Sequence, residues 1–338
     1  MTLTEKGTQT VGSPDARRGT AAALTRARTD SPRPREWKTR FGPSGIHLFD
    51  RTAGLNVLLD EVTVESTRWS RAPRQVSVAL TNRCDLACAH CYAPKSRDTL
   101  HFDTVTGWLS EFDANGTLGV GFGGGEPTLY PRFTELCQHA ACETMLSVSF
   151  TTHGHGIDRK MADGLRGSVH FIRVSMDGVK DTYESIRRRS FAILVEQLKV
   201  IQGISQFGVN VVVNKRTVGE LDEVAEVAAD SGAAELLLLP QEQTHRVSAV
   251  GAATMRELQR WVDGYDGPLK LCINEAHAAG FPTCDPLVAE HGLRAYAHID
   301  ATGTIKPTSY HATGVAVGEG GVLEALELLA RDMREDRP

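Results

Sequence analysis

Between residues 75 and 240 the chain alternates short apolar segments with longer amphipathic ones, and this rhythm restricts the fold more than any other feature. Strands rich in valine, isoleucine and leucine that are separated by helix-length stretches are typical of parallel βαβ units. We therefore predict an α/β core, a partial (βα)6 TIM-like barrel, with its ligand site at the carboxyl ends of the strands. The expected strands cover 75–82, 117–122, 146–152, 169–176, 209–214 and 235–240, and the expected helices cover 102–115, 131–143, 158–166, 181–206 and 219–232.

The segments on either side of this core differ from it in composition. Residues 1–42 hold nine Lys/Arg against four Asp/Glu without a sustained apolar period, which predicts a disordered basic tail. Residues 43–74 contain two apolar segments around 52–54 and predict a hairpin extension. The strand rhythm ends after Pro240, so 241–338 is predicted to form a small α+β C-terminal cap. Within that cap we expect helices near 254–265 and 319–332 and a hairpin over 296–310.

Charge and hydropathy exclude several classes of protein. The body beyond the tail is acidic, which argues against nucleic acid as a partner. No run of about 18 apolar residues exists, so we expect no membrane span. The stretch that follows Arg17-Arg18 is too polar for the core of an export signal, and we expect a cytoplasmic protein.

Three of the seven cysteines crowd into eight residues directly after the first expected strand. Cys84, Cys88 and Cys91 have the spacing C-x3-C-x2-C, which indicates metal binding in a reducing compartment. A structural zinc site would need a fourth ligand, which His90 could supply. An iron–sulfur cluster held by three thiolates would keep one iron open for a substrate or cofactor. The spacing alone leaves both possibilities open.

Two later motifs, together with the cysteines, resemble one enzyme family over residues 75–240. Gly124-Gly125-Glu126-Pro127 follows the second strand, and the Ser175–Gly178 segment, SMDG, follows the fourth. These residues resemble the radical S-adenosylmethionine (radical SAM) enzymes. The string CDLACAHCY resembles their branch of molybdenum-cofactor cyclases and peptide maturases, whose C-terminal SPASM or twitch domains carry extra clusters.

The resemblance implies one [4Fe–4S] cluster held by Cys84, Cys88 and Cys91, with S-adenosylmethionine on its fourth iron. It implies reductive cleavage to a 5′-deoxyadenosyl radical that abstracts hydrogen from an unreactive C–H bond. A flavodoxin or ferredoxin is the expected electron donor, because such a cluster has a low reduction potential.

The resemblance also assigns roles to individual residues. Glycines 124 and 125 would let the backbone approach a ligand, and Glu126 would accept a hydrogen bond from the S-adenosylmethionine ammonium. His153 is the catalytic candidate, as a ligand contact or a proton donor to product. Turns, helix caps and structural hydrogen bonds are the alternative roles for these positions. The remaining expected cofactor contacts are Tyr92, Pro127, Ser175, Asp177, Arg187, Asn214 and Leu239.

The C-terminal region departs from the pattern of that branch. The hairpin IDATGTIKPT ends in Thr308 where relatives carry a cysteine, and only Cys272 and Cys284 remain nearby. Two thiolates cannot supply the usual four cluster ligands, so we predict a degenerate cap and a single cluster. Without an auxiliary electron acceptor, we expect a redox-neutral or reductive outcome such as carbon–carbon coupling, epimerisation or rearrangement.

Three functions remain open from the sequence. The preferred substrate is a small natural-product intermediate of nucleoside or sugar type. The alternative is a ribosomally made precursor peptide, to which the hairpin at 45–62 could add a strand. The alternative of another class is a zinc-binding regulatory protein without enzymatic activity.

Overall fold

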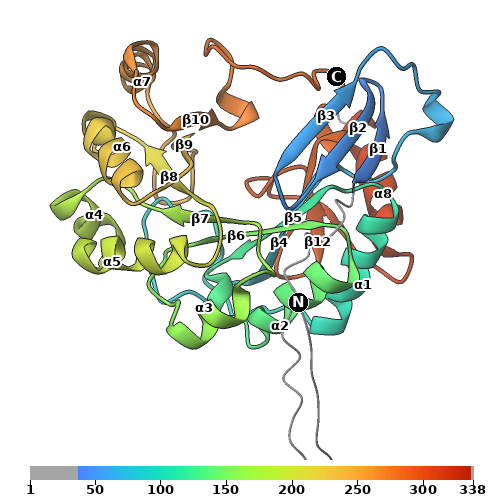
Figure 1. Ribbon diagram of the computed structural model, residues 1–338, viewed down its shortest axis with the longest axis horizontal. Coiled ribbons are helices and arrows are strands. Elements are labelled where there is room, and N and C mark those ends of the chain that lie inside the picture. The colour runs from blue at the N-terminus through green and yellow to red at the C-terminus, as the bar shows by residue number, and fades with distance from the viewer. Residues whose placement is uncertain (1–36, 336–338) are drawn as a thin grey trace, which may run out of the picture. The chain divides into compact units, whose positions relative to one another are not determined.

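The computed structural model describes residues 37–335, and its centre is one ten-stranded sheet (Figure 1). Six neighbouring strands of this sheet are parallel and follow each other in chain order, each joined to the next through a helical segment. They confirm the predicted partial (βα)6 barrel. These strands are β4 (Gln75–Thr81), β5 (Gly119–Gly124), β6 (Ser147–Thr152), β7 (Phe171–Ser175), β8 (Phe207–Val213) and β9 (Glu235–Pro240).

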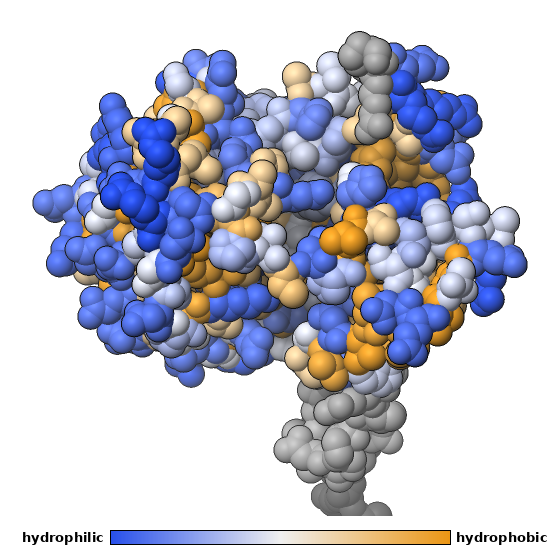
Figure 2. All heavy atoms as spheres, turned by 90° about the horizontal axis from the view of Figure 1, so that it is seen from above, coloured by the Kyte–Doolittle hydropathy of each residue, from blue (hydrophilic) through white to orange (hydrophobic). Residues whose placement is uncertain are grey.

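The two faces of the barrel strands differ in chemistry. On β4, the side chains of Val76, Val78 and Leu80 are fully buried beneath the helices, whereas Gln75 and Ser77 face the interior and are half-buried. The same alternation on the other strands gives a continuous apolar layer outside and a more polar surface inside, because successive side chains point to opposite faces. The hollow at the centre of the face shown in Figure 2 is rimmed largely by hydrophilic residues.

The helices differ from the prediction at one place. The expected helix over 181–206 is two helices, because Arg188 adopts a left-handed conformation with φ 54° and Ser190 caps the second helix. The helices are α1 (Phe102–Ala114), α2 (Phe133–Glu143), α3 (Arg159–Leu165), α4 (Lys180–Arg187), α5 (Phe191–Gln202), α6 (Leu221–Asp230), α7 (Ala252–Gly264) and α8 (Gly321–Glu335).

The N-terminal extension is an antiparallel three-stranded sheet made of β1 (Lys38–Gly42), β2 (Gly45–Asp50) and β3 (Leu55–Leu59). The predicted hairpin corresponds to β2 and β3. The predicted boundary of the tail at residue 42 is wrong, because β1 lies before it. Residues 1–36 of the predicted tail lie outside the described residues.

The sequence does not predict β1 because the charged side chains of this strand are buried. Arg40 is 2% exposed and forms an ion pair with Glu290, with Nε and Oε2 3.1 Å apart. Its guanidinium also donates to the carbonyl oxygens of Ala72, Gly116 and Arg294 at 2.8, 2.9 and 3.0 Å. β1, with the sequence KTRFG, is therefore attached to the rest of the described structure through the buried side chain of Arg40.

The C-terminal region extends the central sheet at both edges, which differs from the predicted separate cap. β10 (Lys270–Ile273) pairs in parallel with β9, and β11 (Tyr296–Ile299) pairs in parallel with β4. β11 then forms the predicted hairpin with β12 (Thr304–Lys306), and β13 (Val315–Ala316) pairs with β12. None of the helices within residues 37–335 is long and apolar enough to cross a membrane.

Candidate functional site

The three predicted cluster cysteines lie on one loop that leaves the carboxyl end of β4. All three are free thiols; Cys88 is buried, and Cys84 and Cys91 are partly exposed. Burial raises the pKa of the Cys84 and Cys88 thiols. The Leu86 amide, 3.4 Å from the Cys84 sulfur, and the charge of Lys95 oppose that effect at Cys84, and Lys95 Nζ also lies 3.7 Å from the Cys91 sulfur. Donors aimed at sulfur suit thiolate ligands.

His90 lies within the same loop, but its side chain is not placed as a fourth zinc ligand beside the cysteines. Its Nε2 lies 3.2 Å from Oδ2 of Asp177, at the end of β7. Within residues 37–335, no three His, Cys, Asp or Glu side chains are placed to hold a single metal ion. The loop therefore fits an iron–sulfur cluster, whose cysteines bind different irons, better than it fits one zinc ion.

The glycines of the GGEP segment pack against the backbone of the cysteine loop. A Cβ at Gly124 would lie 2.2 Å from the Thr81 carbonyl oxygen, and one at Gly125 would lie 2.3 Å from that of Arg83. The amide of Gly125 donates to the Thr81 carbonyl at 2.7 Å. A side chain at either glycine would thus clash with the end of β4 and the start of the cysteine loop. Close packing on this loop, and not the predicted approach to a ligand, accounts for the two glycines. Pro127 is buried directly afterwards, at the start of a 3-10 turn over Pro127–Leu129.

Glu126 is 1% exposed, and its carboxylate already has protein partners. Oε1 accepts from both the amide and the hydroxyl of Thr128, at 3.3 and 2.7 Å, and from the Thr152 hydroxyl at 2.7 Å. Oε2 accepts from the His153 amide at 2.9 Å. The carboxylate thus joins the ends of β5 and β6, and the ammonium contact that we predict for it would compete with these bonds.

His153, the predicted catalytic residue, is 5% exposed and has partners at both ring nitrogens. Nε2 lies 2.8 Å from Oδ1 of Asp85, and Nδ1 accepts from the His155 amide at 3.1 Å. Asp85 lies between Cys84 and Cys88, and its Oδ2 lies 2.5 Å from Arg189 Nη2. These contacts favour a role in holding the cysteine loop over proton donation to a product.

Asp177 and Arg187 form a second buried network at the end of β7. Arg187 Nη2 lies 2.6 Å from Asp177 Oδ2, and the Val212 amide donates to Asp177 Oδ1 at 2.8 Å. Burial opposes ionisation of Asp177, but Arg187 and His90 hold the pKa of its carboxyl well below the usual range. Nε of Arg187 is buried without a hydrogen-bond partner among the described residues. Ser175, two residues before Asp177, is the last residue of β7 and is partly buried.

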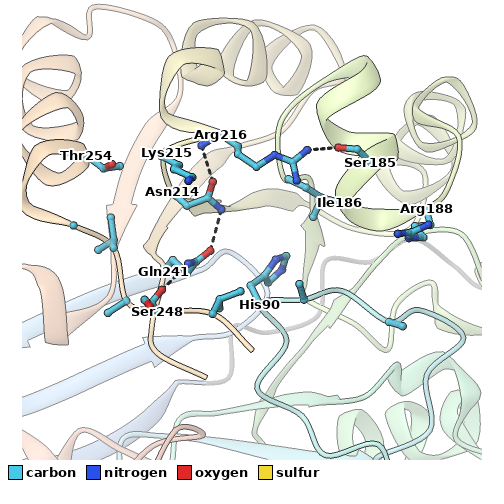
Figure 3. A pocket seen from close by; sticks show the side chains of 16 residues that line it. His90, Ser185, Ile186, Arg188, Asn214, Lys215, Arg216, Gln241, Ser248 and Thr254 are labelled. Atoms are coloured by element: carbon cyan, nitrogen blue, oxygen red, sulfur yellow. Dashed lines mark hydrogen bonds between the residues drawn. The ribbon is translucent and has the colours of Figure 1, made fainter. Parts of the chain in front are cut away.

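A cavity of about 580 Å³ opens beside the cysteine loop at the ends of β8 and β9 (Figure 3). Figure 3 shows His90 on one side of it, facing Asn214 and Gln241, which are joined by a hydrogen bond of 3.1 Å. Lys215 and Arg216 also line it, and none of its sixteen lining residues carries a carboxylate. Asn214, one of the expected cofactor contacts, lines this cavity. Leu239 is not among the lining residues.

Tyr92 points toward the C-terminal region. Its ring lies 5.2 Å from that of Tyr310 and 6.4 Å from that of His298, centroid to centroid. His298 on β11 also contacts Ser77, with 2.6 Å between Nδ1 and Oγ. The structure therefore brings Tyr92 next to residues on both sides of the degenerate hairpin segment, His298 before it and Tyr310 after it.

An open parallel barrel with three cysteines on the loop after its first strand defines a class of iron–sulfur enzymes. The family model described as the Radical SAM superfamily matches residues 78–228, so this part of the chain is a radical SAM domain. The cofactors of such a domain are a [4Fe–4S] cluster and S-adenosylmethionine. Cys84, Cys88 and Cys91 are the residues of the chain that fit the cluster.

Two curated relatives show how far the similarity in sequence extends. Mycofactocin maturase MftC of Mycobacterium tuberculosis (strain CDC 1551 / Oshkosh) is 31% identical over 170 residues, which are 48% of this chain and 43% of that protein. Fe-coproporphyrin III synthase of Methanosarcina barkeri (strain Fusaro / DSM 804) is 29% identical over 157 residues, which are 44% and 39% of the two chains. The chain thus spans less than half the length of these relatives.

The similarity in fold extends further. The crystal structure of Streptococcus suis SuiB bound to precursor peptide SuiA superposes with a TM-score of 0.74 and 15% identity. The superposition covers 89% of this chain and 90% of SuiB.

Sequence reasoning missed Asp85 and Arg189, the two residues that join the cysteine loop to the rest of the site. Asp85 lies inside the cysteine motif, where its position alone gives a signal. Arg189 is one of three consecutive arginines, and nothing local distinguishes it from its neighbours.

Proposed function

We propose that this chain is a radical SAM maturase that acts on a ribosomally made precursor peptide. The observation that carries the proposal is the extent of the similarity to SuiB. The family model covers 78–228, whereas the fold of SuiB, a protein bound to a precursor peptide in its crystal structure, covers 89% of this chain. MftC, a maturase by name, supports the same substrate class. The proposal reverses our preference for a small natural-product intermediate.

The interior of the barrel has the polarity that a peptide substrate needs. Arg173 on β7 and Glu235 on β9 form an ion pair across Gly208 on β8, where a side chain would clash with Glu235. Asn210 accepts from Arg173 at 3.3 Å. Peptide backbone in an enclosed site needs such hydrogen-bonding groups, because unpaired amides are costly to bury.

The chain's own residues would then orient the reacting groups. The cluster and S-adenosylmethionine, when bound, supply the one-electron chemistry that opens an unreactive C–H bond. Cys84, Cys88 and Cys91 would hold the cluster, and Glu126 and His153 would fix the loop that carries them. Tyr92 would form part of the wall toward the C-terminal region.

The test is anaerobic reconstitution followed by incubation with S-adenosylmethionine, dithionite and candidate substrates. The candidates are peptides encoded by short neighbouring reading frames and a panel of nucleosides and sugars. We expect 5′-deoxyadenosine to accumulate with a peptide, together with a mass change in that peptide, and C88A to abolish both. Turnover of a nucleoside or sugar, with every peptide recovered unmodified, would show that the small-molecule prediction is correct instead.

Formation of 5′-deoxyadenosine without a mass change in the peptide would distinguish the proposed radical chemistry from the proposed substrate. If the peptide also keeps its chromatographic retention and, after turnover in D2O, gains no deuterium, the result would show radical chemistry by this chain while excluding the tested peptides as substrates, since an epimerisation or rearrangement leaves the mass in H2O unchanged. About four irons per chain would agree with the single predicted cluster.

A further inference from the structure

Three consecutive arginines at the end of α4 have different environments. Arg188 is one of two non-glycine residues with positive φ among residues 37–335, at φ 54° and ψ 38°. A residue with a Cβ adopts this left-handed conformation at a cost, and glycine is usual at such a helix end. The conformation ends the helix at Arg187 and redirects the backbone before Arg189.

Both flanking arginines reach carboxylates at the cysteine loop. Arg187 pairs with Asp177, and Asp177 contacts His90, which lies between Cys88 and Cys91. Arg189 pairs with Asp85, which lies between Cys84 and Cys88. The two networks therefore contact the loop before and after Cys88 in the sequence.

The two networks differ in burial. Arg187 and Asp177 have side chains that are 11% and 1% exposed, whereas those of Arg189 and Asp85 are 40% and 43% exposed. His153, which is buried, holds Asp85 from its other oxygen. The charge of Arg187 is thus poorly screened by water, while Arg189 acts chiefly through its contact.

We propose that Arg187 and Arg189 are positioning residues that hold the cysteine loop on both sides of Cys88, and that Arg187 also raises the reduction potential of the cluster bound there. A buried cation near a thiolate-held cluster stabilises its reduced form more than its oxidised form, because reduction adds a negative charge.

The first measurement tests the hold on the loop through the release of iron to a chelator. R189Q and D85N, each reconstituted anaerobically, should lose iron about tenfold faster than the unmodified protein, since each loses a charge-assisted hydrogen bond. The double variant should be no faster than D85N, because R189Q and D85N break the same ion pair and D85N also alters the contact with His153. R132Q, which alters an exposed arginine on another helix, is the matched control.

The second measurement is a redox titration of the cluster followed by electron paramagnetic resonance. R187Q should lower the ratio of reduced to oxidised cluster at a given potential by about tenfold, equivalent to a shift of 59 mV for one electron. R187K retains the charge and should remain close to the unmodified potential, so it also covers the case in which R187Q does not fold.

The proposal is overturned by unchanged iron release in R189Q and D85N, by additive effects in their double variant, or by a shift in R187K as large as that in R187Q. Both readouts are taken without substrate. A wrong peptide assignment would leave them unaffected, so failure of this inference and failure of the proposed function are distinguishable.

Discussion

Replacing Glu126 with glutamine tests which role the carboxylate has. The sequence predicts that it binds the S-adenosylmethionine ammonium, whereas in the structure it accepts hydrogen bonds from neighbouring protein groups. The carboxylate accepts four hydrogen bonds, two from Thr128 and one each from Thr152 and His153. Glutamine keeps the shape of the side chain but replaces one oxygen with an NH2 group. At least one buried donor then faces another donor.

The expected cost follows from these bonds. A buried donor left without a partner costs about 1–3 kcal/mol, and the remaining bonds lose the strengthening that a charged acceptor gives. We expect the free energy of unfolding to fall by about 2–4 kcal/mol in E126Q. Urea unfolding of the cysteine-reduced, cluster-free protein measures this loss as a lower midpoint with an unchanged slope.

The control is E135Q, because Glu135 pairs with Arg132 on the surface of α2. Its midpoint should equal that of the unmodified protein. An E126Q midpoint equal to that of E135Q, together with weaker binding of S-adenosylmethionine, would refute the structural role and support the predicted ammonium contact.

Three further predictions concern stability. R40M should lower the free energy of unfolding by about 3 kcal/mol, the lower end of the range for breaking a buried ion pair, because the buried Glu290 keeps only Arg74, at 3.6 Å, as a counter-ion, and adding E290L should restore part of the melting temperature. Burial lowers the pKa of His298 to about 4. As the pH drops from about 6.5 to 4, the unfolded chain therefore binds a proton before the folded one does, and the free energy of unfolding should decrease. In H298Q the midpoint of urea unfolding should vary less with pH. R188G should be about 1 kcal/mol more stable than R188A in thermal unfolding, because glycine adopts the left-handed conformation without strain.

Each stability prediction has an outcome that would contradict it. A normal melting temperature in R40M would mean that the N-terminal sheet is not attached through this ion pair. An identical pH profile in H298Q would show that another group titrates in that range. Equal stability of R188G and R188A would mean that the conformation at position 188 carries no strain.

Local sequence patterns were sufficient for most of the core. The periodicity of segments such as ELLLLP at 235–240 predicts strands because it depends only on neighbouring residues. The pattern failed where a single residue broke it without a usual signal, as at Arg188, where an arginine stands at a position that typically holds glycine. It failed again at β1, whose buried Lys38 and Arg40 look like surface residues until their partners, Asp113 and Glu290, are known.

The candidate site shows the same division. The residue types and spacing of Cys84, Cys88 and Cys91 predicted the cluster loop, and the family comparison supports it. The roles of Glu126 and His153 were predicted from position, but their contacts involve side chains from three separate strand ends. Such contacts depend on how the chain folds in three dimensions, and no local pattern contains them.

The sequence by itself thus determined the order of the core strands and helices and the metal-binding loop, because these follow from residue type and short-range spacing, and its resemblance to radical SAM enzymes implied the class of chemistry. Only the tertiary structure decided that β11 lies beside β4, that Arg189 holds Asp85 while Asp177, the partner of Arg187, holds His90, and that the GGEP glycines pack on the cysteine loop. These features arise from pairing between residues far apart in the chain, where burial and charge select partners that periodicity cannot specify.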